Sequence, residues 1–138
     1  MRPSRPAKRH LLPGGEAGAM VEFALVLPVL VLCLCGIIDF GNIFLQWNLA
    51  NEASREAARY AATYKSSGNP PNKTAVQTYI NGIYPSVTLS QLTPSTPTSG
   101  NTVTATVTNS VTIMTPIISA FFPNNPFTLT GKTTMLVE

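Results

Sequence analysis

Charged side chains are scarce in this sequence. Of its 138 residues, 11% are Asp, Glu, Lys or Arg, against roughly 25% in soluble globular domains. Histidine occurs once, at His10, and the sequence contains neither a glycine-rich phosphate loop nor a nucleophile motif. Glu52 and Glu56 share one predicted helix, but each has an arginine three residues further on. We therefore expect no enzymatic activity, no metal, no cofactor and no small-molecule substrate.

Cysteine is also scarce, with Cys33 and Cys35 as the only two. They lie two residues apart in an apolar run, on different sides of a helix, and cannot bridge each other without breaking it. We interpret both as small apolar side chains of the helix, because a metal or redox site would lack a nearby histidine.

The sequence has one long apolar run, Ala19–Ile38, which is interrupted only by Glu22. As a helix, these 20 residues span about 30 Å, the thickness of the hydrocarbon core of a bilayer. A secretory signal peptide has a shorter apolar core of roughly 7–15 residues followed by a small-residue cleavage site, which this run lacks. The run therefore predicts a membrane-spanning helix in contact with a lipid bilayer.

Basic residues precede the apolar run, at Arg2, Arg5, Lys8 and Arg9. This asymmetry predicts a cytoplasmic N-terminus and an extracytoplasmic remainder. A basic segment can also bind nucleic acid, but this one ends against the apolar run, so we expect no nucleic-acid partner.

The helix is predicted to begin near Gly18 and to continue beyond the membrane to Lys65, where "SSGNPP" stops it. Opposite charges at i,i+3, Glu52 with Arg55 and Glu56 with Arg59, support an exposed helix. Alanines recur at spacings of one, three and four and form a small-residue stripe, which favours intramolecular packing or, alternatively, a subunit contact. The stripe comprises Ala50, Ala53, Ala57, Ala58 and Ala61.

The C-terminal half is predicted to form a small antiparallel sheet after a short helix at 73–84. Residues 86–92 favour a short strand, and residues 102–113 and 127–138 alternate between apolar and polar side chains. "MTPIISAFFPNNP" is predicted to be an apolar loop or one helical turn. Since three strands are marginally stable alone, we expect the amphipathic helix to cover their apolar face. The fold class is therefore α+β.

Four segments follow from this pattern. They are a basic cytoplasmic leader (1–18), a transmembrane helix (19–41), an amphipathic extension (42–66) and a small extracytoplasmic α+β domain (67–138). A long N-terminal helix packed on a small antiparallel sheet is the layout of a type IV pilin.

The segment "AMVEFALVLPVLVLCLCGIIDFGNIFLQWNLANEASREAARYAA" resembles the N-terminal signature of TadE-like proteins, pseudopilins of the tight-adherence (Tad, Flp-type) pilus systems. The matching features are the V-E-F-A-L-V-L-P core, the I-I-D-F-G step and the A-x-R-E-A-A-R-Y-A stretch. The strands that end in "TTMLVE" are similar more loosely.

The resemblance implies a single-pass protein of the bacterial cytoplasmic membrane whose leader is removed by a prepilin peptidase. It also implies a minor or initiating subunit of a surface pilus for adhesion or secretion. The expected partners are the peptidase, other pilin or pseudopilin subunits and the Tad assembly platform. The alternative is a membrane-anchored accessory domain that is neither processed nor assembled.

The cleavage site implied by the resemblance lies among Ala17, Gly18 and Ala19. In the family, glycine usually precedes the cut and the glutamate follows five residues after it. Cleavage after Gly18 keeps the glycine but places it four residues before Glu22, whereas cleavage after Ala17 keeps the spacing and loses the glycine. We favour the Gly18–Ala19 bond.

Glu22, with Phe23 beside it, is predicted to act in register and assembly. A carboxylate in hydrocarbon costs about 2.5–3.5 kcal/mol on insertion scales. The α-amine created by cleavage, from the same chain or a neighbour, would offset that cost and fix the stagger of packed helices. The alternative is a carboxylate that reaches the headgroups from the helix end.

Three further residues are predicted to lie at the membrane interface. Asp39 either ends the spanning stretch at headgroup level or contacts another helix. Phe44 and Trp47 either form an interfacial aromatic belt or pack on the sheet.

Overall fold

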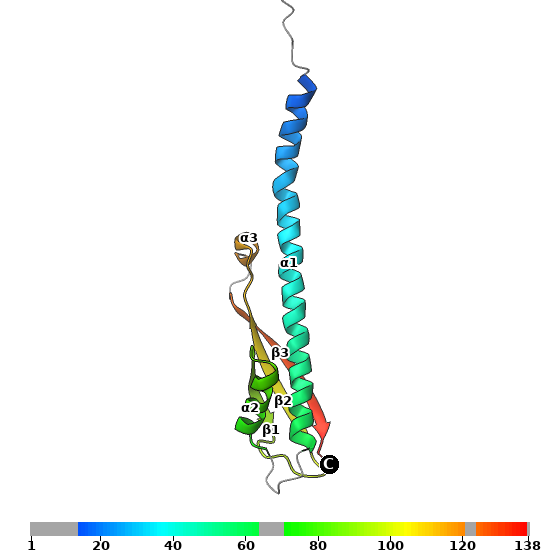
Figure 1. Ribbon diagram of the computed structural model, residues 1–138, viewed down its shortest axis with the longest axis vertical. Helices are drawn as coiled ribbons and strands as arrows, with labels where there is room; N and C mark the ends of the chain where they lie inside the picture. Colours follow the sequence, from blue (N-terminus) through cyan, green and yellow to red (C-terminus); the bar gives the residue numbers. More distant parts are fainter. Residues whose placement is uncertain (1–13, 64–70, 121–123, 138) are drawn as a thin grey trace, which may run out of the picture. The chain divides into compact units, whose positions relative to one another are not determined.

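The computed structural model describes residues 14–63, 71–120 and 124–137 (Figure 1). Their elements are α1 (Gly14–Thr63), α2 (Lys73–Ile83), β1 (Val87–Thr93), β2 (Thr102–Val111), α3 (Pro116–Ser119) and β3 (Phe127–Leu136). The chain divides into two compact units, Met1–Cys35 and Gly36–Glu138, so α1 contributes its first part to one unit and its second part to the other. The predicted α+β class is confirmed.

The described part of the first unit is the beginning of α1. This helix starts at Gly14, four residues before the predicted start at Gly18. Pro28 lies inside α1, and because proline has no N–H, the carbonyl of Ala24 lacks its usual helical donor.

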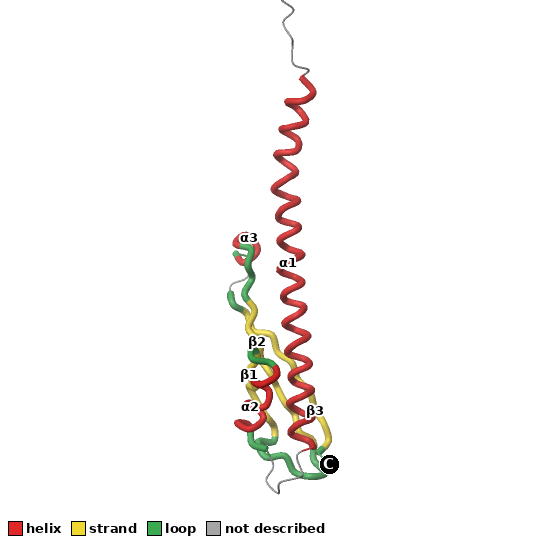
Figure 2. Tube along the Cα trace, in the orientation of Figure 1, coloured by secondary structure: helices red, strands yellow, loops and turns green. Residues whose placement is uncertain are grey.

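The second unit contains an antiparallel sheet with the strand order β1-β2-β3 (Figure 2). The β2–β3 register runs from Thr102 opposite Leu136 to Val111 opposite Phe127 without a shift. The β1–β2 register shifts between Leu89 and Gln91. An extra residue at such a bulge resets the alternation, and here it returns Leu92 to the buried face.

One face of the sheet is covered by the last third of α1 together with α2. Ala53, Ala57 and Ala58 of α1 are fully buried, and Val76 and Ile80 of α2 belong to the same core. Small side chains allow the helix backbone to approach the sheet closely. The prediction that the alanine stripe serves intramolecular packing is confirmed.

Helix α1 approaches β3 closely at Gly131. A Cβ added there would lie 2.6 Å from the carbonyl carbon of Ala50 and 2.9 Å from the amide nitrogen of Asn51. Two residues further on, the Thr133 hydroxyl lies 2.7 Å from that of Ser54, which is itself fully buried. On the inward face of β3, Gly131 therefore leaves room for the backbone of α1, and Thr133 bonds to Ser54 of the helix.

The predicted alternation of the strands is confirmed. Val103, Ala105 and Val107 of β2 are fully buried, and Val111 and Ile113 continue on the same side. The opposite face is rich in threonine, and Thr104 and Thr134 are joined across β2 and β3 by a hydrogen bond of 2.8 Å. This leaves the sheet with one apolar and one polar face.

The two short helices match their predictions closely. Helix α2 begins after Asn72, whose side chain accepts a hydrogen bond of 2.9 Å from the Ala75 amide and caps the first turn. Helix α3 is the single helical turn that was one of the two predictions for the segment after β2. Within the predicted loop, residues 121–123 lie outside the described part of the chain.

Candidate membrane-anchor and assembly site

The apolar stretch of α1 is exposed along its length. Within Ala17–Thr63, the most apolar window has a mean hydropathy of 2.7, and none of that window is buried inside the protein. Met20 and Leu25 are 75% and 72% exposed, respectively. By length and composition, α1 is the one helix among the described residues that could cross a membrane.

The segment predicted to contain the cleavage site lies inside α1. Because the helix begins at Gly14, Ala17, Gly18 and Ala19 all have helical backbone. Their side chains are exposed, and a Cβ added at Gly18 would meet nothing within 4 Å. The first four N–H groups of any helix lack intrahelical acceptors, so the first turn of α1 is held by fewer hydrogen bonds than its interior.

Glu22 and Phe23 follow on the same helix, and both are exposed. Within the described ranges, Glu22 has neither a hydrogen bond nor an ion pair with another side chain. Phe23 is 64% exposed. Their proposed partners therefore have to come from outside the described part of this chain.

Asp39 is held by the chain segment that follows β2. It is only 4% exposed, and its carboxylate oxygens accept hydrogen bonds of 3.1 Å from the amides of Met114 and Thr115. A carboxylate can be buried when hydrogen-bond donors replace water in this way. Asp39 is thus bonded within its own chain, and its place at headgroup level or against another helix remains a prediction.

Phe44 and Trp47 lie one turn apart and touch each other. Their ring centroids are 6.1 Å apart with planes tilted by 44°. Phe44 is 53% exposed and Trp47 is 46% exposed, so much of each ring is left uncovered by the sheet. The pair therefore keeps enough free surface to act as an interfacial belt, which remains a prediction.

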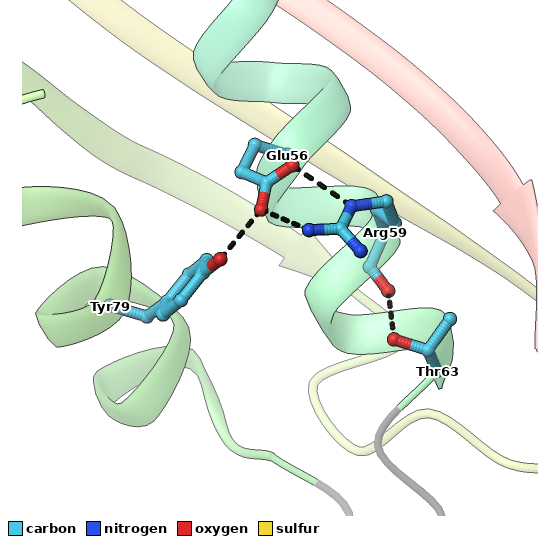
Figure 3. Close-up of polar contacts among 4 residues, drawn as sticks. All are labelled: Glu56, Arg59, Thr63 and Tyr79. Carbon is cyan, nitrogen blue, oxygen red and sulfur yellow. Dashed lines mark hydrogen bonds and ion pairs between the residues drawn. The ribbon is translucent and has the colours of Figure 1, made fainter. Parts of the chain in front are cut away.

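A polar cluster joins α1 to α2 at the side of the core (Figure 3). Glu56 accepts a hydrogen bond of 2.9 Å from Nε of Arg59 and one of 2.6 Å from the Tyr79 hydroxyl. The ring of Tyr79 stacks on Tyr60 with centroids 4.2 Å apart. The predicted Glu56–Arg59 pair is thus confirmed, whereas no ion pair joins Glu52 to Arg55 in the described structure.

The same cluster shifts the pKa values of Glu56 and Tyr79. The hydrogen bonds from Arg59 and then from Tyr79 lower the pKa of Glu56 below its usual value, because they favour the charged carboxylate. The hydrogen bond to Glu56 raises the pKa of Tyr79, because ionisation would remove the donated proton. Both shifts favour the protonation states present at neutral pH.

One buried polar contact was missed by the sequence analysis. Asn109 lies on the apolar face of β2 and is 3% exposed. Its side-chain amide donates a hydrogen bond of 2.7 Å to the side-chain oxygen of Gln46 on α1. The signal was available, because Asn109 occupies an inward position in an otherwise apolar alternation.

The described residues contain no group of three or more His, Cys, Asp or Glu side chains that could hold a metal ion. Cys33 is exposed and Cys35 is half-buried, and both are free thiols. Two features of the described chain bear on function: the exposed apolar part of α1 and the sheet that packs on its second part.

The architecture is that of an α+β protein of the pilin type, anchored in a membrane by an apolar N-terminal helix. Residues 18–59 match the family model described as TadE-like protein, so this segment is similar to that family. The match confirms the resemblance over that segment and indicates a Tad pilus-associated protein. Neither a curated protein nor a solved structure matches the chain.

Proposed function

We propose that the protein is a pseudopilin, processed by a prepilin peptidase and used as a minor or initiating structural subunit in Tad pilus assembly. Its N-terminus is cytoplasmic, and its sheet lies outside the membrane. The observation that carries this proposal is the extent of the family match, which begins at Gly18 and ends at Arg59. It thus covers the apolar helix, Glu22, Asp39 and the alanine-rich surface that docks on the sheet.

Processing requires the first turns of α1 to open. A peptidase binds an extended backbone, whereas the bonds at Ala17–Gly18 and Gly18–Ala19 are helical. Opening is inexpensive at this end because several N–H groups have no intrahelical partner and because glycine favours the unfolded chain by about 0.5–1 kcal/mol relative to alanine in a helix. We propose the Gly18–Ala19 bond as the site of cleavage.

Cleavage creates a positive α-ammonium group that can pair with the carboxylate of Glu22. A carboxylate inside the bilayer costs about 2.5–3.5 kcal/mol, and a new α-ammonium on Ala19 lies less than one helical turn before it. When processed helices pack side by side, the ammonium of one chain neutralises the carboxylate of its own chain or of a neighbour. The pairing fixes the axial register between subunits.

The first test compares Glu22→Ala with the wild type and with Glu52→Ala, an exposed carboxylate outside the apolar run. Each is co-expressed with the peptidase and the pilus components, and both the N-terminus and the incorporation into filaments are measured. Glu22→Ala is expected to lower incorporation about tenfold or more, as loss of a register-fixing interaction worth about 1.4 kcal/mol would. Glu52→Ala is expected to assemble normally.

Unchanged assembly of Glu22→Ala would remove the role of this carboxylate in register. An unprocessed chain that never enters filaments would instead support the alternative, a membrane-anchored accessory domain.

A further inference from the structure

The segment after β2 is tied to α1 at the point where the apolar run ends. No charged residue lies between Glu22 and Asp39, so Asp39 marks the end of the lipid-compatible stretch. Its carboxylate binds the amides of Met114 and Thr115 at 3.1 Å each. These two hydrogen bonds hold the start of the β2–β3 connection level with the end of the apolar run.

The surface around this contact is apolar and uncovered. Met114 is 77% exposed, and Ile38 and Phe40, which flank Asp39 on α1, are 66% and 69% exposed. The sequence from Ile113 to Pro126 contains no charged residue. An apolar surface of this kind is expected to face lipid or another protein rather than water.

We propose that Met114, at the start of the β2–β3 connection, forms a second membrane contact, which lies in the outer interface of the bilayer beside the emerging α1. At such interfaces, the apolar face of an element is buried about 5–10 Å into the boundary between headgroups and acyl chains. The proposal rests on the proposed membrane insertion of α1. It assigns a function to Asp39, which positions the connection against the bilayer.

The bilayer fits this surface better than a second copy of the chain does. The exposed side chains continue directly from the exposed apolar run of α1, so the same lipid that surrounds Ile38 reaches Met114. The carboxylate of Asp39 already accepts hydrogen bonds from two internal amides, so it does not need donors from a protein partner. Helix α3 begins directly after Thr115, so the chain turns back within the apolar segment.

The test uses tryptophan fluorescence of the full chain in phosphatidylcholine vesicles, with quenching by lipids brominated on the acyl chains near the headgroups. Trp47 is the only tryptophan, so Trp47→Phe supplies a silent background. Met114→Trp reports on the proposed contact. Leu136→Trp is the matched control, because Leu136 is 62% exposed and pairs with Thr102 at the opposite end of the sheet from Val111 and Phe127. Phe40→Trp reports on the helix itself.

We expect Met114→Trp and Phe40→Trp each to lose more than about half of their emission, as shallow interfacial burial requires, while Leu136→Trp is unaffected. Adding Asp39→Asn should reduce the quenching of Met114→Trp and leave that of Phe40→Trp unchanged, since an amide offers one acceptor oxygen instead of two. If Asp39→Asn does not fold, the comparison of Met114→Trp with Leu136→Trp still decides the proposal.

Three results would overturn the proposal. Equal quenching of Met114→Trp and Leu136→Trp, with Phe40→Trp quenched, would reject the second contact and leave the membrane helix intact. Loss of quenching at Phe40→Trp would reject membrane insertion and with it both proposals. A blue shift of Met114→Trp that grows with protein density, without quenching by lipid, would assign this surface to a contact between subunits.

Discussion

Gly131 sets how closely β3 can approach α1. Its missing Cβ leaves room for the helix backbone, since an added methyl group would lie 2.6 Å from the carbonyl carbon of Ala50. Backbone atoms cannot move aside as a flexible side chain can, so strand and helix would have to separate. The contact between β3 and α1 therefore depends on the absence of one carbon atom.

We predict that Gly131→Ala destabilises the second unit by about 1–3 kcal/mol, the usual range for overpacking. The measurement is thermal unfolding of the full chain in detergent micelles, followed by near-ultraviolet circular dichroism of its tyrosines. Gly82→Ala is the control, because a Cβ at Gly82 in α2 meets nothing within 4 Å. It should be neutral or stabilising by up to about 1 kcal/mol. Equal effects of the two substitutions would refute the close approach.

Glu56 should make stability depend on pH at the acid end. Its pKa is lower in the folded protein than its ordinary value of 4.5. The ionised carboxylate therefore contributes stability above that ordinary value, and the contribution is lost as the pH falls through the folded pKa. Glu56→Gln is expected to cost about 0.2–1 kcal/mol at pH 7 and to flatten the acid limb of the stability curve.

The control for this prediction is Glu52→Gln, which changes an exposed carboxylate one turn earlier on α1. It should leave the acid limb as it is in the wild type. Tyr79 acts at the opposite end, because its raised pKa means that its stabilising hydrogen bond is lost as the pH rises above the ordinary value of 10.0. An acid limb that persists in Glu56→Gln would exclude Glu56 as its source.

At the scale of elements, the second part of α1 covers the apolar face of the sheet. Ala57 and Ala58 are fully buried against it, whereas Arg55 and Arg59 on the same turns are exposed. The helix is thus apolar and small on one side and charged on the other. This division explains how a three-stranded sheet, marginal alone, is stabilised by a helix that also serves as an anchor.

We predict that Ala57→Leu destabilises the second unit by about 1–3 kcal/mol, because the larger side chain does not fit between α1 and the sheet. Arg55→Leu, on the exposed side of the same helix, should change stability by no more than about 0.5 kcal/mol. Chemical unfolding in micelles provides the comparison. If Ala57→Leu left stability unchanged and impaired only assembly, the alanine stripe would serve contacts between subunits.

Most elements could be predicted from the sequence because their signals are periodic. The alternation of β2 and β3 requires only that one face of the sheet be covered. The alanine stripe likewise follows from the helical period. These patterns show which face of each element is buried, because the side chains on a buried face are apolar and recur with the period of the element.

The partners in contacts between distant residues left no periodic signal and could not be predicted. The partner of Asp39 lies 75 residues further along the chain, and Asn109 reaches Gln46 across 63 residues. The bulge near Ser90 depends on the register of two strands. The start of α1 at Gly14 was also missed, because glycine has a low helix propensity.

At the scale of the whole molecule, the chain combines two requirements in one helix. Its first part must be apolar enough to be stable in lipid, and its second part must be narrow enough to dock on a sheet. The family match from 18 to 59 covers both parts. The sequence alone therefore predicted the membrane anchor and its docking surface, whereas the processing step depends on the family resemblance.

We propose that the membrane helix of the mature protein starts at Ala19, three residues before Glu22, after removal of a basic leader. The most direct test of this proposal is the intact mass of the chain extracted from membranes of a host that carries the prepilin peptidase. We expect a chain that lacks Met1–Gly18 and begins at Ala19. A membrane-extracted chain that retains its entire sequence from Met1 to Glu138, in the presence of active peptidase, would contradict it.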